Sequence, residues 1–406
     1  MERFVPRLLP VVLAVLALLA GAAPAAAQRQ AGGSPCSQPL ADPITIVNVP
    51  GGAVNPTLSD GCWLFVMVNR PPAEGGPGVA VLRRSDETFT PVRTVPAPYS
   101  APASGMLLTN DQRLLVVAAA GSLTFIDVEK ATTGDANAVL GQMQGLPGGF
   151  KLTVTPDDRY LFVPQYGPSR VSMIDLARAR ASGFAADTLV ASAIPTGRNP
   201  ITALVSPDGR HVYATNLVAP DVLAGPLTCI DGKQREGGIQ IIDVSKAQAD
   251  PGSATLGWAF PAGCGPNAMT LSPDGARLSN TAGNNVIQNP DATGMALVVF
   301  DTTPVRDGKP PTRIGAIPVP KGPIGVVDTG SRIVIGFQRQ GESYPELLVV
   351  DPSKVAAGAE AIVGTIPYRS GGLGLSADGR TLIAANLTGD VAFIDLDRVT
   401  LQPAAR

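Results

Sequence analysis

The stretch LGLSADGRTLIAANLTGDVAFIDLD, Leu373 to Asp397, contains a short apolar run, a tight turn, a second run, another turn and a third run that ends in Asp. Similar stretches occur earlier in the chain: LTVTPDDRYLFVPQYGPSRVSMIDLA at 152–177, ALVSPDGRHVYATN at 203–216 and MTLSPDGARLSNTAGN at 269–284. Short apolar runs bounded by Asp- and Gly-containing turns are typical of β-strands joined by hairpins. The sequence therefore predicts one strand-turn-strand unit repeated along the chain.

Seven copies of the turn can be aligned, and the chain around each copy follows the same order of apolar runs. The turns are LSDG (58–61), TNDQ (109–112), TPDD (155–158), SPDG (206–209), SPDG (272–275), DTGS (328–331) and SADG (376–379). In six copies the third run ends in Asp: Asp127, Asp175, Asp243, Asp301, Asp351 and Asp395. A fourth run closes most copies, as at 191–195, 314–320 and 363–368. Four short strands in a repeat of roughly 40–50 residues predict an all-β fold, a seven-bladed β-propeller.

The two ends of the chain indicate how the ring closes. After Asp395 only LDRVTLQPAAR remains, which has no clear fourth strand, whereas ITIVNVPGG at 44–52 resembles a fourth strand with its following loop. We therefore expect the N-terminal strand to complete the last blade, which removes an exposed sheet edge. The expected organisation is a propeller over 44–398, an N-terminal extension over 28–43 and a C-terminal tail over 399–406.

The composition and the first residues indicate an exported protein. The chain has 406 residues, a net charge of −2, 45 Gly and 39 Pro, and no Lys/Arg-rich block of the kind that binds nucleic acid. Arg3 and Arg7 precede an apolar run at 11–20, and Ala25 to Ala27 offer a cleavage site, so residues 1–27 are predicted to be a signal peptide. No later segment is long enough to span a bilayer. We expect a monomer in the periplasm or outside the cell, without cofactor or metal.

The repeats resemble a known family. VYATN (212–216) after SPDGR, with IIDV (241–244) closing the unit, resembles the YVTN-type repeat of bacterial seven-bladed propellers, whose relatives include the propeller lactonase family. The resemblance covers nearly all of the chain after the signal peptide and implies the fold. For activity it implies one candidate, hydrolysis of a lactone.

The four cysteines predict two disulfides in an exported chain, and three pairings are possible. We call the end of the ring with the turns between first and second strands the bottom face, and the opposite end the top face. Cys229 and Cys264 lie in loops that emerge on the top face, whereas Cys62 and Cys36 belong to the bottom face. The expected pairs are Cys36–Cys62 and Cys229–Cys264.

The recurrent turn acids and the single histidine favour structural roles. The Asp of each turn recurs with an Arg shortly after it in six blades, which is best explained by turn geometry, capping and exposed pairing within each blade. His211 directly follows SPDGR and is expected at the surface of the bottom face. The catalytic residues, if any, are unknown from the sequence.

The candidate binding site is on the top face, where the loops 69–78, 164–170, 217–237, 283–295 and 338–345 are longer than tight hairpins need. Three connections between blades place a cation at nearly the same point: PTGRNP contains Arg198, VPKGP contains Lys321 and PYRSGG contains Arg369. The neighbouring candidates are Arg170, Arg339, Asn199 and Asn267. Sevenfold geometry would bring these cations to the channel mouth, where they would bind a small anionic ligand or an acidic segment of a protein partner.

The alternative is a lactonase-like hydrolase that acts on a sugar-acid lactone. It would need cationic stabilisation of the oxyanion, from Arg198, Arg170 or Arg369, together with a base or an activated water. The candidate bases are Glu74, Asp221, Asp231 and Glu342, all in loops.

Overall fold

The structure is a computed structural model, and Ser34–Arg406 form one compact unit in it. The residues that the structure describes are 36, 40–49, 51–60, 62–68, 76–85, 88–97, 105–119, 121–146, 151–184, 190–223, 227–229, 234–283, 295–320, 322–337, 345–386 and 389–404. The expected signal peptide lies outside them. Within the described residues, no helix combines the length and the apolar character needed to cross a membrane.

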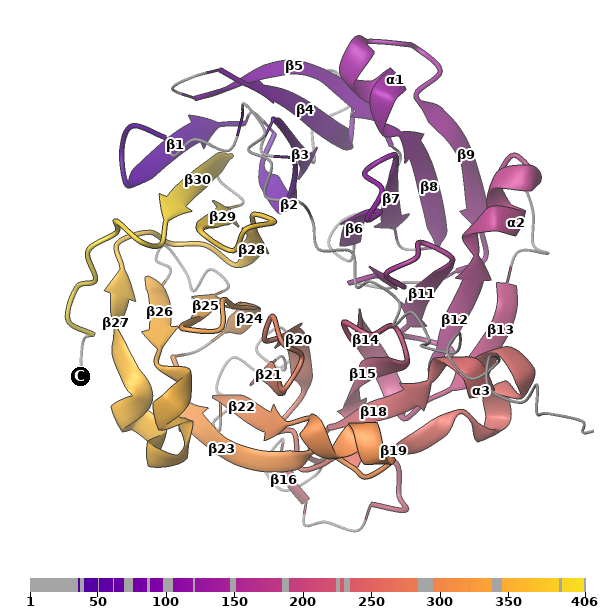
Figure 1. Ribbon diagram of the computed structural model, residues 1–406, viewed down its shortest axis with the longest axis vertical. Coiled ribbons are helices and arrows are strands. Elements are labelled where there is room, and N and C mark those ends of the chain that lie inside the picture. The colour runs from indigo at the N-terminus through magenta and orange to yellow at the C-terminus, as the bar shows by residue number, and fades with distance from the viewer. Residues whose placement is uncertain are drawn as a thin grey trace, which may run out of the picture. The chain divides into compact units, whose positions relative to one another are not determined.

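Seven four-stranded antiparallel sheets are arranged in a ring, which confirms the predicted seven-bladed β-propeller (Figure 1). Blades one to three comprise β2 (Ala53–Ser59), β3 (Trp63–Val68), β4 (Gly78–Arg84) and β5 (Phe89–Pro96); β6 (Gly105–Leu108), β7 (Leu114–Ala119), β8 (Ser122–Asp127) and β9 (Val139–Gln144); β10 (Thr153–Val154), β11 (Tyr160–Gln165), β12 (Arg170–Asp175) and β13 (Val190–Pro195).

The other four blades follow the same order from the inner to the outer strand. They comprise β14 (Arg198–Val205), β15 (His211–Val218), β18 (Gly238–Asp243) and β19 (Thr255–Ala259); β20 (Pro266–Leu271), β21 (Arg277–Ala282), β22 (Ala296–Asp301) and β23 (Thr312–Pro318); β24 (Pro323–Asp328), β25 (Ile333–Phe337), β26 (Leu347–Val350) and β27 (Ile362–Ile366); β28 (Gly372–Leu375), β29 (Thr381–Ala385), β30 (Asp390–Asp395) and β1 (Ile44–Asn48). An insertion in blade four adds the two-stranded sheet of β16 (Leu227–Cys229) and β17 (Gln234–Arg235).

The ring closes as the sequence predicts. β1 pairs with β30 in antiparallel register, from Ile44 opposite Ile394 to Asn48 opposite Asp390. The chain after β30 is not a loose tail, because the main chain of Gln402 exchanges two hydrogen bonds, of 2.9 and 2.8 Å, with Thr365 on the outer strand of blade six.

Five of the seven repeated turns are held by a hydroxyl group and a carboxylate at the bottom face. In blade four the Ser206 hydroxyl donates to Asp208 Oδ1 at 2.6 Å and accepts from the His211 amide at 3.0 Å. Gly209 has a φ of 72°, which glycine adopts at no steric cost. The same hydroxyl–carboxylate bond occurs in blades two, three, five and seven: Thr109–Asp111, Thr155–Asp157, Ser272–Asp274 and Ser376–Asp378. These acids therefore have the structural role expected of them.

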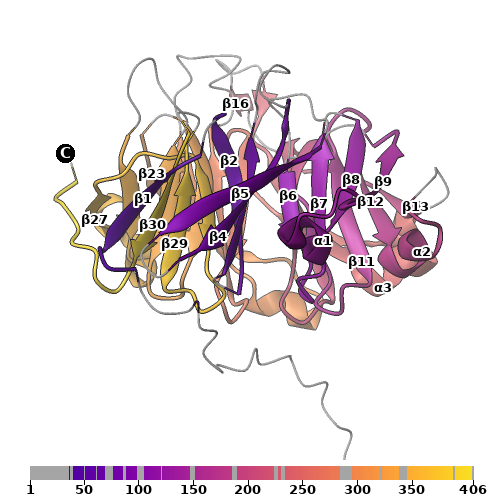
Figure 2. The ribbon, with the colours of Figure 1, turned by 90° about the horizontal axis from the view of Figure 1, so that it is seen from above.

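The Asp at the end of the third strand caps a helix at the bottom face. Side chains of Asp127, Asp175 and Asp243 accept hydrogen bonds from the third residue of α1 (Val128–Thr133), α2 (Leu176–Ala181) and α3 (Val244–Ala249). Such caps satisfy amides that have no partner within the helix. The 3₁₀ helices are η3 (Pro251–Ser253), η5 (Thr303–Asp307) and η6 (Pro352–Ala361), the last capped by Asp351. Figure 2 shows α1, α2 and α3 in the lower half of the ring and β16 at its upper edge.

The expected pairing of Asp with Arg inside each blade is only partly correct. Arg210 does bond Asp208 of its own turn at 2.8 Å. Arg277 of blade five, however, binds Asp328 of blade six through two 2.9 Å hydrogen bonds, and Arg180 of blade three lies 3.5 Å from Asp111 of blade two. Neighbouring blades place their turns side by side, so these side chains also connect one blade to the next.

The core consists of seven clusters of buried side chains, one between each pair of neighbouring blades. Between blades three and four, Phe162 and Met173 pack against Val212 and Ala214. Both faces of each sheet are therefore covered, which explains why the strands are apolar at successive positions rather than at alternate ones.

Candidate functional site

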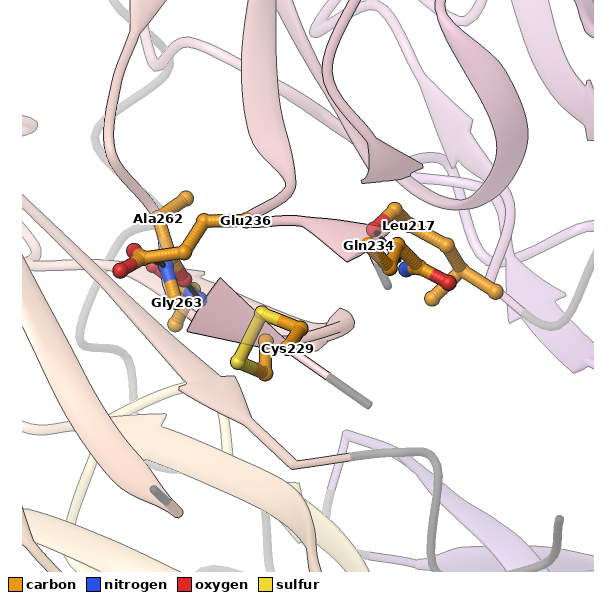
Figure 3. Close-up of a disulfide and its surroundings, with 8 residues drawn as sticks. Leu217, Cys229, Gln234, Glu236, Ala262 and Gly263 are labelled. Atoms are coloured by element: carbon orange, nitrogen blue, oxygen red, sulfur yellow. Dashed lines mark hydrogen bonds between the residues drawn. A yellow bond between two sulfur atoms is a disulfide. The ribbon is translucent and has the colours of Figure 1, made fainter. Parts of the chain in front are cut away.

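The disulfides pair as predicted from blade geometry. Cys229 bonds Cys264 and Cys36 bonds Cys62, with Cα atoms 5.5 and 5.0 Å apart. The first joins β16 of the blade-four insertion to the connection between blades four and five (Figure 3). A carboxylate oxygen of Glu236 accepts a 3.0 Å hydrogen bond from the Gly263 amide beside it. The insertion is therefore attached to the top face at two neighbouring points.

The candidates Arg198 and Asn199 begin β14 at the top face. Arg198 is exposed, whereas Asn199 is half-buried with a φ of 56°. The Asn199 side-chain amide donates to the Tyr166 carbonyl at 3.1 Å, and its main-chain amide donates to the Ser169 hydroxyl at 3.3 Å. Asn199 therefore connects blade four to the β11–β12 turn of blade three and holds Arg198 at the boundary of these blades.

Arg170 lies close to this boundary, at the start of β12, and its Nε donates to the side-chain oxygen of Gln165. The surrounding loop is shorter than expected. β11 extends to Gln165 and β12 begins at Arg170, so the segment 164–170 is a hairpin with four turn residues, not a long insertion. Gln165 is fully buried, and its Nε2 has no partner among the described residues.

The remaining candidates are distributed around the ring. Arg369 is exposed in the connection between β27 and β28, and β28 lies across the ring from β14 in Figure 1. Asn267 is half-buried on β20, and its carbonyl accepts a 2.7 Å hydrogen bond from the Thr202 hydroxyl. Lys321 and Arg339 lie outside the described residues. The structure therefore places Arg170, Arg198 and Asn199 at one boundary between blades and Arg369 in another connection.

The two faces differ in how their charges are paired. Six ion pairs between described residues are on the bottom face: Arg180–Asp111, Arg210–Asp208, Arg277–Asp328, Lys354–Asp351, Arg380–Asp397 and Arg398–Asp395. On the top face Asp221, one of the candidate bases, pairs with Arg235 at 2.8 Å in the blade-four insertion. Arg170, Arg198 and Arg369 form no ion pair with any described carboxylate. The other candidate bases, Glu74, Asp231 and Glu342, lie outside the described residues.

One cation near the ring axis was missed by the sequence reasoning. Lys151 is half-buried, two residues before β10, and its main chain pairs with the Thr202 segment of β14. Burial lowers the pKa of Lys151 from 10.5 to about 8. Its side chain has no hydrogen bond or ion pair to a described residue. The repeat alignment could have found it, because it occupies an inner-strand position where other blades have small side chains.

His211 lies on β15 at the bottom face and pairs in register with Asp243. Burial lowers the pKa of His211, and the nearby carboxylates of Asp208 and Asp243 oppose this effect. Among the described residues, no group of three or more His, Cys, Asp and Glu side chains is arranged to hold a metal ion.

Comparison with known proteins bears on the fold. No protein family matches the chain, and no curated protein is significantly similar to it in sequence. Among solved structures, the fold is similar to one described as Kuenenia stuttgartiensis hydrazine synthase, with a TM-score of 0.61 and 17% sequence identity over 86% of this chain and 96% of that chain. At this identity the similarity concerns the fold alone.

Proposed function

We propose that this chain is an exported propeller scaffold that binds a small anionic ligand through its top face, without catalysis. The observation that carries the proposal is the contrast in charge pairing. The cations Lys151, Arg170, Arg198 and Arg369 are at the top, and none has a described carboxylate partner, whereas six ion pairs join described residues of the bottom face. Cations without an internal counter-ion attract anions, and guanidinium groups orient carboxylates through paired hydrogen bonds.

The same surface would accept an acidic segment of an extracellular or envelope protein. Such a partner would be attracted by the same field, and its binding would weaken strongly with added salt because exposed charges are screened. A small ligand that reaches a partly buried cation would be less sensitive to salt. The two kinds of partner are therefore distinguishable by titration at two ionic strengths.

The second candidate is a lactone hydrolase, which the resemblance to propeller lactonases implies. One observation favours it: an amine whose pKa is about 8, as for Lys151, can accept a proton from an attacking water near neutral pH. Water would add to the lactone carbonyl, the ring C–O bond would break, and a hydroxycarboxylic acid would result. Release of acid from gluconolactone above the spontaneous rate, lost in Lys151→Met, would support this alternative.

Calorimetric titration with sugar acids and acidic peptides tests the binding proposal. The triple variant Arg198→Ala/Lys321→Ala/Arg369→Ala should weaken binding by at least about tenfold, since charge-assisted hydrogen bonds contribute about 1.5–3 kcal/mol each. The matched control is Arg178→Ala/Arg306→Ala/Lys309→Ala, which removes three exposed cations from the bottom face. Equal affinity in the wild type and the triple variant, at low and high salt, would refute the proposal.

A further inference from the structure

The interface between blades three and four differs from its neighbours at one inner-strand position. In the five blades whose turn begins with a hydrogen-bonded Ser or Thr, the residue four positions earlier is Gly105, Lys151, Thr202, Ala268 or Gly372. The β-bridge between Lys151 and Thr202 shows that these two positions lie side by side in blades three and four. Only Lys151 carries a charge.

Lys151 faces blade four. The Thr153 hydroxyl, two residues later, accepts a 3.0 Å hydrogen bond from the Val205 amide of blade four. Leu152 belongs instead to the cluster between blades two and three. Side chains alternate along an extended chain, so Lys151 is on the same side as Thr153. Its main chain also bonds Ile201 and Ala203 of blade four, at 3.4 and 3.2 Å.

Asn216 of blade four faces blade three, across the interface from Lys151. Val212 and Ala214 pack in the cluster between blades three and four, and Asn216 is the next residue on that side of β15. It is fully buried, and its Nδ2 donates to the Ala214 carbonyl at 2.9 Å. Its Oδ1 has no hydrogen-bond partner among the described residues. A buried amide oxygen without a donor is costly, so a ligand hydroxyl that donates to Asn216 Oδ1 would be favoured here.

Both groups are at the same height of the interface, close to the top face. Asn216 is in register with Pro200, and the next residue, Ile201, is the one that accepts from the Lys151 amide. A Cβ atom at Gly197 would lie 3.2 Å from Asn216 Cγ, so the connection that carries Arg198 passes directly beside the amide. One boundary between blades therefore carries an ammonium group, an amide oxygen acceptor and an exposed guanidinium group.

We propose that Lys151 and Asn216 form an off-axis subsite between blades three and four for a small hydroxycarboxylic acid, with Arg198 at its entrance. The ligand carboxylate accepts from the Lys151 ammonium, and a ligand hydroxyl donates to Asn216 Oδ1. The subsite rests on the proposed anion-binding function and specifies both its ligand class and its position. The proposed ligand contacts one boundary between blades rather than a symmetric ring of cations, and Arg369 does not contact it.

The state of Lys151 makes binding depend on pH. Burial alone lowers its pKa to about 8, so an anion that pairs with the ammonium would raise that pKa. On the strands packed against it, Arg198 is the charged residue at the top, while Tyr160 of β11 and His211 and Tyr213 of β15 are at or near the bottom ends. Affinity should therefore fall as the pH rises through 8 and beyond.

The test compares glycolate with acetate, and gluconate with hexanoate, by calorimetric titration at pH 7. Lys151→Met should weaken glycolate and gluconate binding on the order of tenfold or more, while Lys309→Met, an exposed bottom-face control, should match the wild type. Asn216→Ala should remove the preference for the hydroxylated acid over its partner. Lys151→Arg should retain part of the affinity, since it keeps the charge.

A second measurement does not depend on a variant folding. Acetylation of Lys151 by acetic anhydride at pH 8, followed by peptide mapping, should slow at least about threefold when gluconate is bound, as expected for an amine held by a bound anion. If the wild type binds none of these acids, both the subsite and the anion-binding function are wrong. If it binds them, and neither Lys151→Met nor the acetylation rate shows an effect, the subsite is wrong and the top-face function stands.

Discussion

The bottom and top faces of the propeller are built from the same repeats, yet they use their charged residues differently. At the bottom the carboxylates of the repeated turns have partners. Burial alone would raise the pKa of Asp208, but hydrogen bonds from Ser206 and Arg210 lower it to about 2. At the top Lys151 is desolvated without a described partner, and buried Asn216 has an unpaired oxygen. Satisfied polar groups stabilise a fold, whereas unsatisfied ones at a rigid boundary are available to a ligand.

This comparison gives the bottom face the role of joining blades and the top face the role of binding. Arg277 and Asp328 show the first role, because they connect blades five and six through a bidentate pair in which the Asp328 side chain is fully buried. For the second role we propose Lys151, because its charge is costly to bury and nothing in the described structure compensates it. The following predictions test whether stability and binding separate in this way.

The largest effect is expected from Asp328→Ala. It leaves the Arg277 guanidinium largely buried without its counter-ion, which costs about 3–5 kcal/mol of unfolding free energy. Urea denaturation measures the change. Arg210→Ala, which removes an exposed pair, should cost at most about 1 kcal/mol. If Asp328→Ala lowers the free energy of unfolding no more than Arg210→Ala does, ion pairs that connect two blades contribute no more to stability than exposed pairs within one blade.

The next largest effects are expected from removing the two disulfides, which should differ between the bottom and the top face. Cys36→Ser/Cys62→Ser frees the segment before the closing strand β1 and should lower the free energy of unfolding by about 2–4 kcal/mol. Cys229→Ser/Cys264→Ser frees an insertion outside the seven sheets, so its main effect should be faster amide hydrogen exchange in 227–229 and 234–235. If Cys229→Ser/Cys264→Ser lowers the free energy of unfolding as much as Cys36→Ser/Cys62→Ser does, or more, the insertion stabilises the ring.

The smallest effect concerns pH and Lys151. Its folded pKa is about 8 and its ordinary value is 10.5, so between these values the unfolded chain binds more protons than the folded one. Its contribution to stability therefore rises with pH in that window and is least favourable below pH 8. Denaturant midpoints of wild type and Lys151→Met, measured from pH 7 to 10.5, should converge as the pH increases. A constant difference would mean that the amine is not desolvated.

Much of the fold could be predicted because its determinants are local. The Ser/Thr-x-Asp turn at 206–208 forms from hydrogen bonds within six residues, and Asp243 caps the helix that directly follows it. The absence of a fourth strand after Asp395 required another segment to complete the blade, and 44–48 was the one with the right pattern. The disulfide pairs followed, since strand order assigns each cysteine to one end of the ring.

The site was less predictable because it depends on contacts between blades. Sequence equivalence suggested that Arg198 and Arg369 would both face the channel mouth. Their blades lie across the ring from each other, and their convergence on one ligand stays a prediction. Asn199 was expected to bind a ligand, and only the structure shows that its side-chain amide donates to the Tyr166 carbonyl of the neighbouring blade. The choice of Asp328 as the partner of Arg277 likewise depends on the rotation from one blade to the next.

The sequence by itself determined the number of blades, the strand order, the closure and the cysteine pairs, because the turns and the short apolar runs that carry this information each act over a few residues. Only the tertiary structure decided that half-buried Lys151 lies opposite Asn216, whose side-chain oxygen has no partner among the described residues. Desolvation is a property of everything that surrounds a group, and the residues that surround Lys151 come from two blades whose sequences carry no sign of that encounter.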